Sequence, residues 1–205
     1  MSVFSVLIAG VGGQGVLLTS KVLAEAALAS GLDVKQSEVH GMAQRGGSVV
    51  SHVRFGEEVF SPVISPGECD LVIGFEPLEA ARYIHFLRDD GAVVYSTRRI
   101  MPLPVSSCIE NYPVGVEEKI VSYAKRIKAL DAASIAIQAG DKRALNIVML
   151  GAAIEFVGLE ERKVAGALKK TSPPKALEIN KRAYLLGKEF QPEKVGRPFK
   201  KGSPR

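Results

Sequence analysis

The sequence predicts an α/β fold in which a mostly parallel β-sheet is doubly wound, with a helical C-terminal portion. An apolar run from Val3 to Ala9 stops at a glycine turn, as a strand buried on both faces does. A segment with helical spacing follows from Gln14 to Ser30 and ends at Gly31. Further apolar strand segments then alternate with helical ones, which is the pattern of a layered α/β domain.

The first elements form a β–α–β unit, for which we expect a right-handed crossover. Val34 to Glu38 is the predicted second strand, and the later elements follow in order. Strands are expected at Ser48 to Phe55, Asp70 to Phe75 and Ala92 to Ser96, short extended pieces at Pro102 to Pro113, and helices at about Pro77 to Leu87, Val116 to Ile127, Arg143 to Phe156, Glu160 to Lys170 and Lys175 to Phe190. This order predicts one Rossmann-like domain over residues 1–190.

Composition agrees with one globular domain and a basic tail. The chain has 205 residues, of which 46% are hydrophobic and 24% charged, so there is enough apolar area for a sizeable core. Residues 191–205 carry a net charge of +4 of the total of +5, and we expect this tail to be flexible. Because the first 190 residues are nearly neutral, a nucleic-acid partner is not favoured.

The chain has two cysteines, Cys69 and Cys108, which are far apart in sequence. Neither belongs to a Cys-x-x-Cys pair, so the sequence offers no metal site and no clustered thiolates for an iron–sulfur centre. No apolar run approaches the ~20 residues of a membrane span, and no signal peptide is evident. We therefore expect a cytoplasmic protein without a membrane partner.

The first candidate site is the turn Gly10-Val11-Gly12-Gly13-Gln14-Gly15, a G-x-G-x-x-G that opens a helix directly after a buried strand. Such a turn lets an anionic group approach main-chain N–H groups at a helix N-terminus. Glu38 follows Gly15 by 23 residues, close to where a dinucleotide-binding unit places its ribose-binding acid. The same glycines would also serve close helix–strand packing, so the spacing leaves a nucleotide site and a purely structural turn open.

The second candidate is the polar, glycine-rich loop that follows the second predicted strand. Arg45 offers a planar fork for a carboxylate or phosphate, and His40 can exchange protons near neutral pH. Gln44 is the third polar candidate in this loop. A loop at a strand end suits ligand binding, and it suits docking to a partner subunit equally well. The residues assigned to such an interface are Gly41, Met42, Ala43, Gly46 and Gly47.

These two segments resemble a known family. GVGGQG at residues 10–15 followed by SEVHGMAQRGGSVVSHVR at residues 37–54 is similar to the gamma-type domain of 2-oxoacid:ferredoxin oxidoreductases. The likeness covers most of residues 1–190. Within the family, the loop EVHGMAQRGG resembles that of the beta subunits of the indolepyruvate enzymes, whereas the pyruvate and 2-oxoglutarate enzymes share GGQG and have a different loop.

The resemblance implies an accessory subunit of a complex that oxidatively decarboxylates an aryl pyruvate, with CoA accepting the acyl group and ferredoxin the electrons. Thiamine diphosphate, Mg²⁺ and [4Fe–4S] clusters are then expected on a large alpha subunit, and no cofactor is bound solely by this chain. No catalytic residue is expected to act on this chain alone. In the assembled complex, His40, Gln44 and Arg45 are the candidates for a contribution to the active site. The glycine turn, with Glu38, would contact a CoA phosphate or a nucleotide.

Three alternatives remain at this point. The chain could be a gamma subunit for another 2-oxoacid, or a stand-alone NAD(P)-binding protein that uses the glycine turn and Glu38. It could also be a non-enzymatic protein whose basic tail binds nucleic acid, which predicts a steep salt dependence of binding. The last two do not explain why GGQG and the polar loop occur together.

Overall fold

The computed structural model describes residues 3–40 and 47–191, and it is an α/β fold with a six-stranded sheet. The strands are β1 (Phe4–Val11), β2 (Asp33–His40), β3 (Ser48–Gly56), β4 (Cys69–Gly74), β5 (Leu87–Ser96) and β6 (Arg126–Leu130). The helices are α1 (Val16–Ala29), α2 (Pro77–Tyr83), α3 (Leu103–Ser106), α4 (Val116–Tyr123), α5 (Ala132–Ala139), α6 (Leu145–Val157), α7 (Glu161–Thr171) and α8 (Leu177–Glu189). The predicted fold class is confirmed.

The sheet is mixed, with the order β2-β3-β1-β4-β5-β6. The pairs β1·β4, β4·β5 and β5·β6 are parallel, whereas β3 runs antiparallel to both of its neighbours. The first β–α–β unit therefore does not place β2 beside β1, because β3 lies between them. This arrangement puts the carboxyl ends of β1 and β4 side by side.

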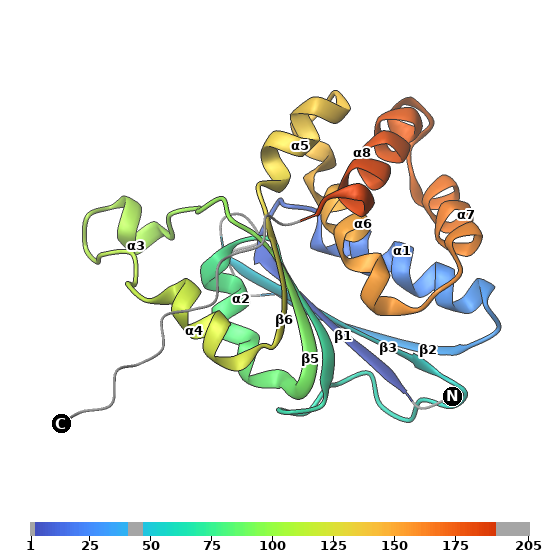
Figure 1. Ribbon diagram of the computed structural model, residues 1–205, viewed down its shortest axis with the longest axis horizontal. Helices are drawn as coiled ribbons and strands as arrows, with labels where there is room; N and C mark the ends of the chain where they lie inside the picture. Colours follow the sequence, from blue (N-terminus) through green and yellow to red (C-terminus); the bar gives the residue numbers. More distant parts are fainter. Residues whose placement is uncertain (1–2, 41–46, 192–205) are drawn as a thin grey trace.

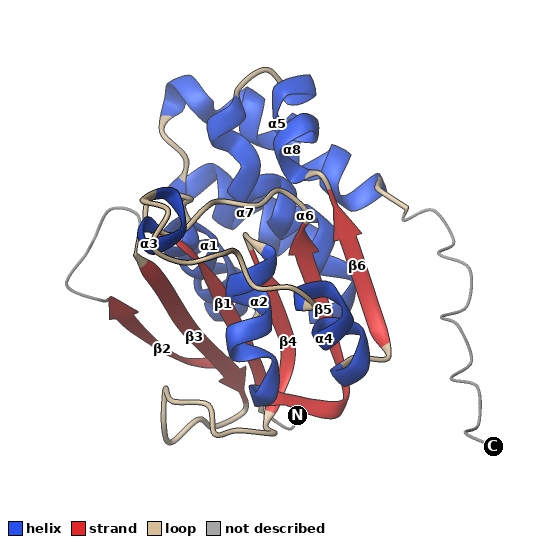
Figure 2. Cartoon of the chain, turned by 90° about the vertical axis from the view of Figure 1, so that its left-hand side faces the viewer, coloured by secondary structure: helices blue, strands red, loops and turns tan. Residues whose placement is uncertain are grey.

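Helices cover both faces of the sheet (Figures 1 and 2). Helices α1, α5, α6, α7 and α8 lie over one face, and α2 and α4 lie over the other. The side chains of β1 alternate accordingly: Val6 and Ile8 belong to the core under α1 and α6, and Leu7 and Ala9 to the core under α2 and α4. Because β1 is buried on both faces, its run of apolar residues is explained.

Two sequence-based expectations are wrong in detail. The predicted helix from Val116 to Ile127 ends at Tyr123, and β6 and α5 follow it. The strand was hidden by its sequence, RIKAL, in which Lys128 is 3% exposed and pairs with Glu155 at 2.8 Å. The proline-rich segment from Pro102 to Pro113, expected to be extended, contains the one-turn helix α3.

The C-terminal helices form the helical portion that the sequence predicts. Helix α5 ends at Gly140, whose φ of +116° is in the left-handed region. No helix of the described residues is both long and apolar enough to cross a bilayer. The predicted tail from 191 to 205 lies, apart from Gln191, outside the described residues, as does the loop segment 41–46.

Helices α6 and α8 pack closely at two glycines, Gly151 of α6 and Gly187 of α8, each of which faces the backbone of the other helix. A Cβ on Gly151 would lie 2.1 Å from the Tyr184 carbonyl oxygen, whereas a Cβ on Gly166 in α7 would meet no atom within 4 Å. Gly151→Ala should therefore destabilise the chain by about 1–3 kcal/mol through overpacking. Gly166→Ala, the matched control, should stabilise it by up to about 1 kcal/mol, because alanine favours helix.

Urea unfolding of the full chain, followed by far-ultraviolet circular dichroism, gives both changes. Equal unfolding midpoints for the two variants would contradict the close crossing of α6 and α8.

Candidate functional site

The glycine turn lies at the carboxyl end of β1 and leads directly into α1. Gly13 and Gly15 have φ angles of +100° and +87°, a backbone conformation that only glycine adopts without strain. Gly15 is the N-cap residue of α1 and provides no side-chain cap. The first N–H groups of an α-helix have no acceptor within the helix, so this turn presents donors and the positive end of the helix dipole.

Gln14 fastens the turn to the neighbouring strand. Its Oε1 accepts the N–H of Val11 at 2.7 Å, and its Nε2 donates to the carbonyl oxygen of Phe75 at 3.0 Å. Phe75 follows β4, and its own N–H donates to the carbonyl of Ala9 at 2.8 Å. The Gln14 amide therefore fills the crevice between the ends of β1 and β4, where an open α/β sheet commonly binds its ligand.

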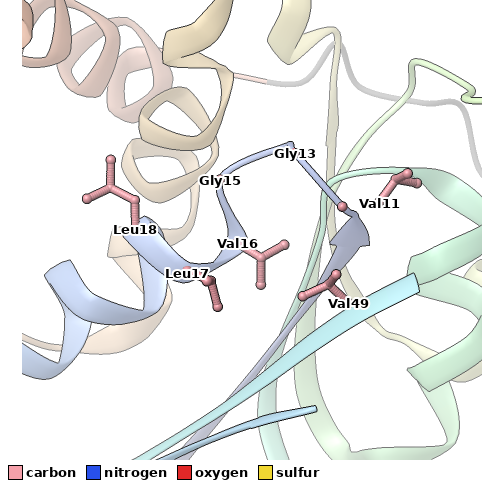
Figure 3. A pocket seen from close by; sticks show the side chains of 8 residues that line it. Val11, Gly13, Gly15, Val16, Leu17, Leu18 and Val49 are labelled. Carbon is pink, nitrogen blue, oxygen red and sulfur yellow. The ribbon is translucent and has the colours of Figure 1, made fainter. Parts of the chain in front are cut away.

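A hollow of about 460 Å³ opens beside the turn, and we call it the α1 hollow. Figure 3 shows Val16 and Leu17 projecting from the first turn of α1 and Val49 from β3. The lining consists of Val11, Gly12, Gly13, Gly15, Val16, Leu17, Leu18 and Val49. Because its described side chains are aliphatic, the α1 hollow suits an apolar group next to the backbone donors of the turn.

The predicted site residues fall into three groups. Gly12, Gly13 and Gly15 line the α1 hollow, while Gly10 lies in β1 opposite Val49 and Gln14 bridges the strands. Glu38 lies in β2, and its carboxylate accepts a hydrogen bond from Gln36 at 2.9 Å. Since β3 separates β2 from β1, Glu38 is not among the residues that line the α1 hollow.

The polar loop is described only at its ends. His40 is the last residue of β2 and pairs with Val49 of β3 through the backbone. At the other end, the carbonyl oxygen of Gly47 accepts the N–H of Gly12 at 2.8 Å, so this end of the loop lies against the glycine turn. Gly41, Met42, Ala43, Gln44, Arg45 and Gly46 lie outside the described residues.

Sequence reasoning missed three buried polar residues near the carboxyl ends of β1 and β4 or in contact with segments that pack there. Asn146 at the start of α6 is 4% exposed, and its backbone carbonyl accepts the hydroxyl of Thr19 at 3.2 Å. Glu76, the N-cap residue of α2, is 1% exposed, and Glu79 on α2 is 4% exposed. Buried carboxylates are rare, so nothing in the sequence marked these two as buried. The one available signal was the spacing of an acid before and after Pro77, which is typical of a helix start.

The two buried glutamates have different partners. Glu76 caps α2 by accepting the N–H of Glu79 at 3.0 Å, and it accepts the hydroxyl of Tyr112 at 2.7 Å. Glu79 accepts the hydroxyl of Ser48 and lies 3.2 Å from Arg82. Burial raises the pKa of the Glu79 carboxyl, although the hydrogen bond from Ser48 acts in the opposite direction.

The cysteines and histidines provide no metal centre in the described part of the chain. Cys69 and Cys108 are both free cysteines, the first buried and the second exposed, and burial raises the pKa of the Cys69 thiol to about 12. His52 accepts the N–H of Ile64 at 3.2 Å, and His85 packs against Phe86. Within residues 3–40 and 47–191, no group of three or more His, Cys, Asp or Glu side chains could hold a metal ion.

Comparison with known proteins decides the family. The pyruvate ferredoxin/flavodoxin oxidoreductase family matches residues 5–190, which is nearly the whole described chain. The chain belongs to this family. Its glycine turn, α1 hollow and polar loop are therefore features of a 2-oxoacid oxidoreductase domain.

Individual relatives agree with the family. The chain is 39% identical to indolepyruvate oxidoreductase subunit IorB of Thermococcus kodakarensis, over 96% of this chain and 100% of that protein. It is 38% identical to the protein of the same name from Pyrococcus horikoshii, over 91% and 95% of the two chains. The gamma subunit of a keto/oxoacid ferredoxin oxidoreductase from Geobacter sulfurreducens has the same fold, with a TM-score of 0.70 and 24% identity over 92% and 96% of the two chains.

The double hydrogen bond of Gln14 predicts a specific cost of replacing it. Gln14→Leu keeps a similar volume but leaves the Val11 N–H and the Phe75 carbonyl without their partner, which should destabilise the chain by about 1–3 kcal/mol. Gln14→Glu keeps the acceptor for Val11 but places a carboxylate oxygen against the Phe75 carbonyl oxygen, so it should be destabilising as well.

Urea unfolding of the full chain measures these differences, with the exposed Gln138 of α5 changed to Leu as the control. If Gln14→Leu were as stable as Gln138→Leu, the bridge between β1 and β4 would contribute nothing.

Proposed function

We propose that this chain is the accessory subunit of an indolepyruvate ferredoxin oxidoreductase. The observation that carries the proposal is its similarity, along nearly its entire length, to the IorB subunits of two archaea. The complex would convert an aryl pyruvate, CoA and two oxidised ferredoxins to an aryl-acetyl-CoA, CO₂ and two reduced ferredoxins. A gamma subunit for another 2-oxoacid is less well supported, because those relatives are named for indolepyruvate.

The cofactors of this reaction belong, in this proposal, to a large alpha subunit. A [4Fe–4S] cluster needs several cysteine thiolates, and this chain has only the two distant residues Cys69 and Cys108. Gly140-Asp141-Lys142 lacks the second glycine of a Gly-Asp-Gly thiamine diphosphate motif, and Asp141 is paired with Arg143 at 2.6 Å. The residues of this chain therefore do not fit thiamine diphosphate with Mg²⁺ or an iron–sulfur cluster.

The contribution of this chain would be to bind and orient. The backbone donors at the start of α1, between Gly12 and Leu17, are the proposed contact for a CoA phosphate. The N–H of Gly12 already donates to Gly47, so Gly13 and Gly15 are the better placed glycines for an anion. The aliphatic lining of the α1 hollow would then contact the apolar part of the same ligand.

The polar loop would face the partner. His40, Gln44 and Arg45 are proposed to contact the partner's cofactor or the carboxylate of the aryl pyruvate, and Gly41, Met42, Ala43, Gly46 and Gly47 to form the interface around them. Arg45 suits a carboxylate because its guanidinium donates two parallel hydrogen bonds. Gly47, the last residue of this loop, lies against Gly12, so the end of the loop is joined to the glycine turn.

Stand-alone NAD(P) binding is less well supported. A dinucleotide unit places its ribose-binding acid on the strand next to β1, and here that neighbour is the antiparallel strand β3. Glu38 lies one strand further away, on β2. Fluorescence titration of the isolated chain with NADH distinguishes an accessory subunit from a stand-alone NAD(P)-binding protein. Binding of NADH with micromolar affinity would favour the NAD(P)-binding protein.

The proposal is tested with the complex that a tagged copy of this chain retains. Under anaerobic conditions, indolepyruvate and CoA should reduce ferredoxin or a viologen dye, and the activity should disappear when the large partner is removed. Reduction that does not require CoA, or that the chain performs alone, would contradict an accessory role.

Arg45→Ala gives a residue-level prediction for the same complex. Loss of the guanidinium should lower kcat/KM for indolepyruvate by about tenfold or more, because a charge-assisted bidentate contact is lost. Arg162→Ala is the control, since Arg162 is exposed and its ion pair is with Glu160, which is also exposed. Circular dichroism should show both variants folded. An unchanged kcat/KM in the Arg45→Ala complex would remove Arg45 from the site.

A further inference from the structure

Glu79 of α2 is a buried carboxylate whose hydrogen bond to β3 suggests a role beyond packing. Its side chain is 5% exposed, its Oε1 lies 3.2 Å from the Arg82 Nε, and its Oε2 accepts the Ser48 hydroxyl. Burying a carboxylate costs free energy, and an apolar side chain of similar volume is often as stable or more stable in such a position. The Arg82 side chain is half exposed, so its ion pair is screened by solvent, and the buried partner of the Glu79 carboxylate is the Ser48 hydroxyl.

Ser48 connects Glu79 to the backbone that contacts the glycine turn. It is the first residue of β3 and follows Gly47, whose carbonyl oxygen accepts the Gly12 N–H at 2.8 Å. The Ser48 hydroxyl oxygen also lies 3.4 Å from the hydroxyl of Tyr83, at the end of α2. A continuous path of contacts thus runs from Glu79 through Ser48 and Gly47 to the glycine turn.

Glu79 cannot reach the turn by itself, so its effect must pass through β3. Helix α2 follows β4, and Gln14 already fixes the end of β4 to the end of β1 through the Phe75 carbonyl. The bond from Glu79 to Ser48 adds the start of β3 to this assembly. Three chain segments of the same sheet edge are then held in one relative position.

We propose that Glu79 is a positioning residue, which holds Ser48 and Gly47 so that the glycine turn and the start of β3 keep a fixed geometry beside the α1 hollow. The geometric part needs only this chain. Its consequence for catalysis rests on the proposed function, in which the turn contacts CoA.

The first test measures the geometry by amide hydrogen exchange in the full, isolated chain. Glu79→Met removes the acceptor at similar length, Ser48→Ala removes the donor, and Glu79→Gln keeps an acceptor oxygen. We expect the Gly12 amide to exchange about tenfold faster in Glu79→Met and Ser48→Ala, and within about threefold of the unaltered chain in Glu79→Gln.

Two references separate positioning from general loss of stability. Amides of α6, such as that of Val148, should change by less than about twofold, because α6 packs on the opposite face of the sheet. Glu118→Met replaces an exposed glutamate of α4 and should leave Gly12 exchange unchanged. Unaltered Gly12 exchange in both Glu79→Met and Ser48→Ala, or an equal acceleration in α6, would overturn the proposal.

The second test uses the complex reconstituted with the large partner. The KM for CoA should rise about tenfold in Glu79→Met and Ser48→Ala, with kcat at saturating CoA within about twofold, and Glu79→Gln should restore the KM. An unchanged KM would overturn the role of Glu79 in the reaction. If the unaltered complex shows no CoA-dependent oxidation of indolepyruvate, the proposed function fails, and the exchange test alone decides whether Glu79 positions the turn.

Discussion

The two hydrogen bonds of the Gln14 side chain are the constraint on which the geometry of the candidate site depends. They join the ends of β1 and β4, the neighbouring parallel strands from which the chain leaves toward opposite faces of the sheet. Helix α1 then covers one face and α2 the other. Both helices start close to this junction, at the carboxyl ends of β1 and β4. The bonds of Gln14 therefore help to fix the start of α1 relative to the start of α2, where an open α/β sheet commonly binds its ligand.

Helix α2 extends this constraint to two further segments. Glu76 holds the segment around Tyr112, and Glu79 holds the start of β3 through Ser48. The polar loop therefore begins and ends on strands whose positions are tied to the glycine turn. In the proposed function, the backbone N–H groups of the glycine turn help to complete the site of a partner. Such groups bind more tightly when they are already held in place before the partner binds.

Much of the fold could be predicted from sequence, because β1, β4 and the second half of β5 are buried on both faces and consist mainly of apolar residues. The strand β6 could not, since one of its two buried positions is occupied by Lys128, whose charge is paired with Glu155 from α6. The placement of β3 between β1 and β2 was also hidden, because pairing partners are set by long-range contacts that the local pattern does not encode. At the site, the glycine turn was predictable from its spacing, whereas Glu76 and Glu79 look like ordinary surface acids.

In the proposed function, this chain completes the active site of a larger partner. The most direct measurement titrates the chain into a fixed amount of the large subunit, with indolepyruvate, CoA and a viologen dye present in excess under anaerobic conditions. We expect the rate of dye reduction to rise with added chain and to reach a plateau at a fixed ratio of the two subunits. Full activity of the large subunit without this chain would contradict it.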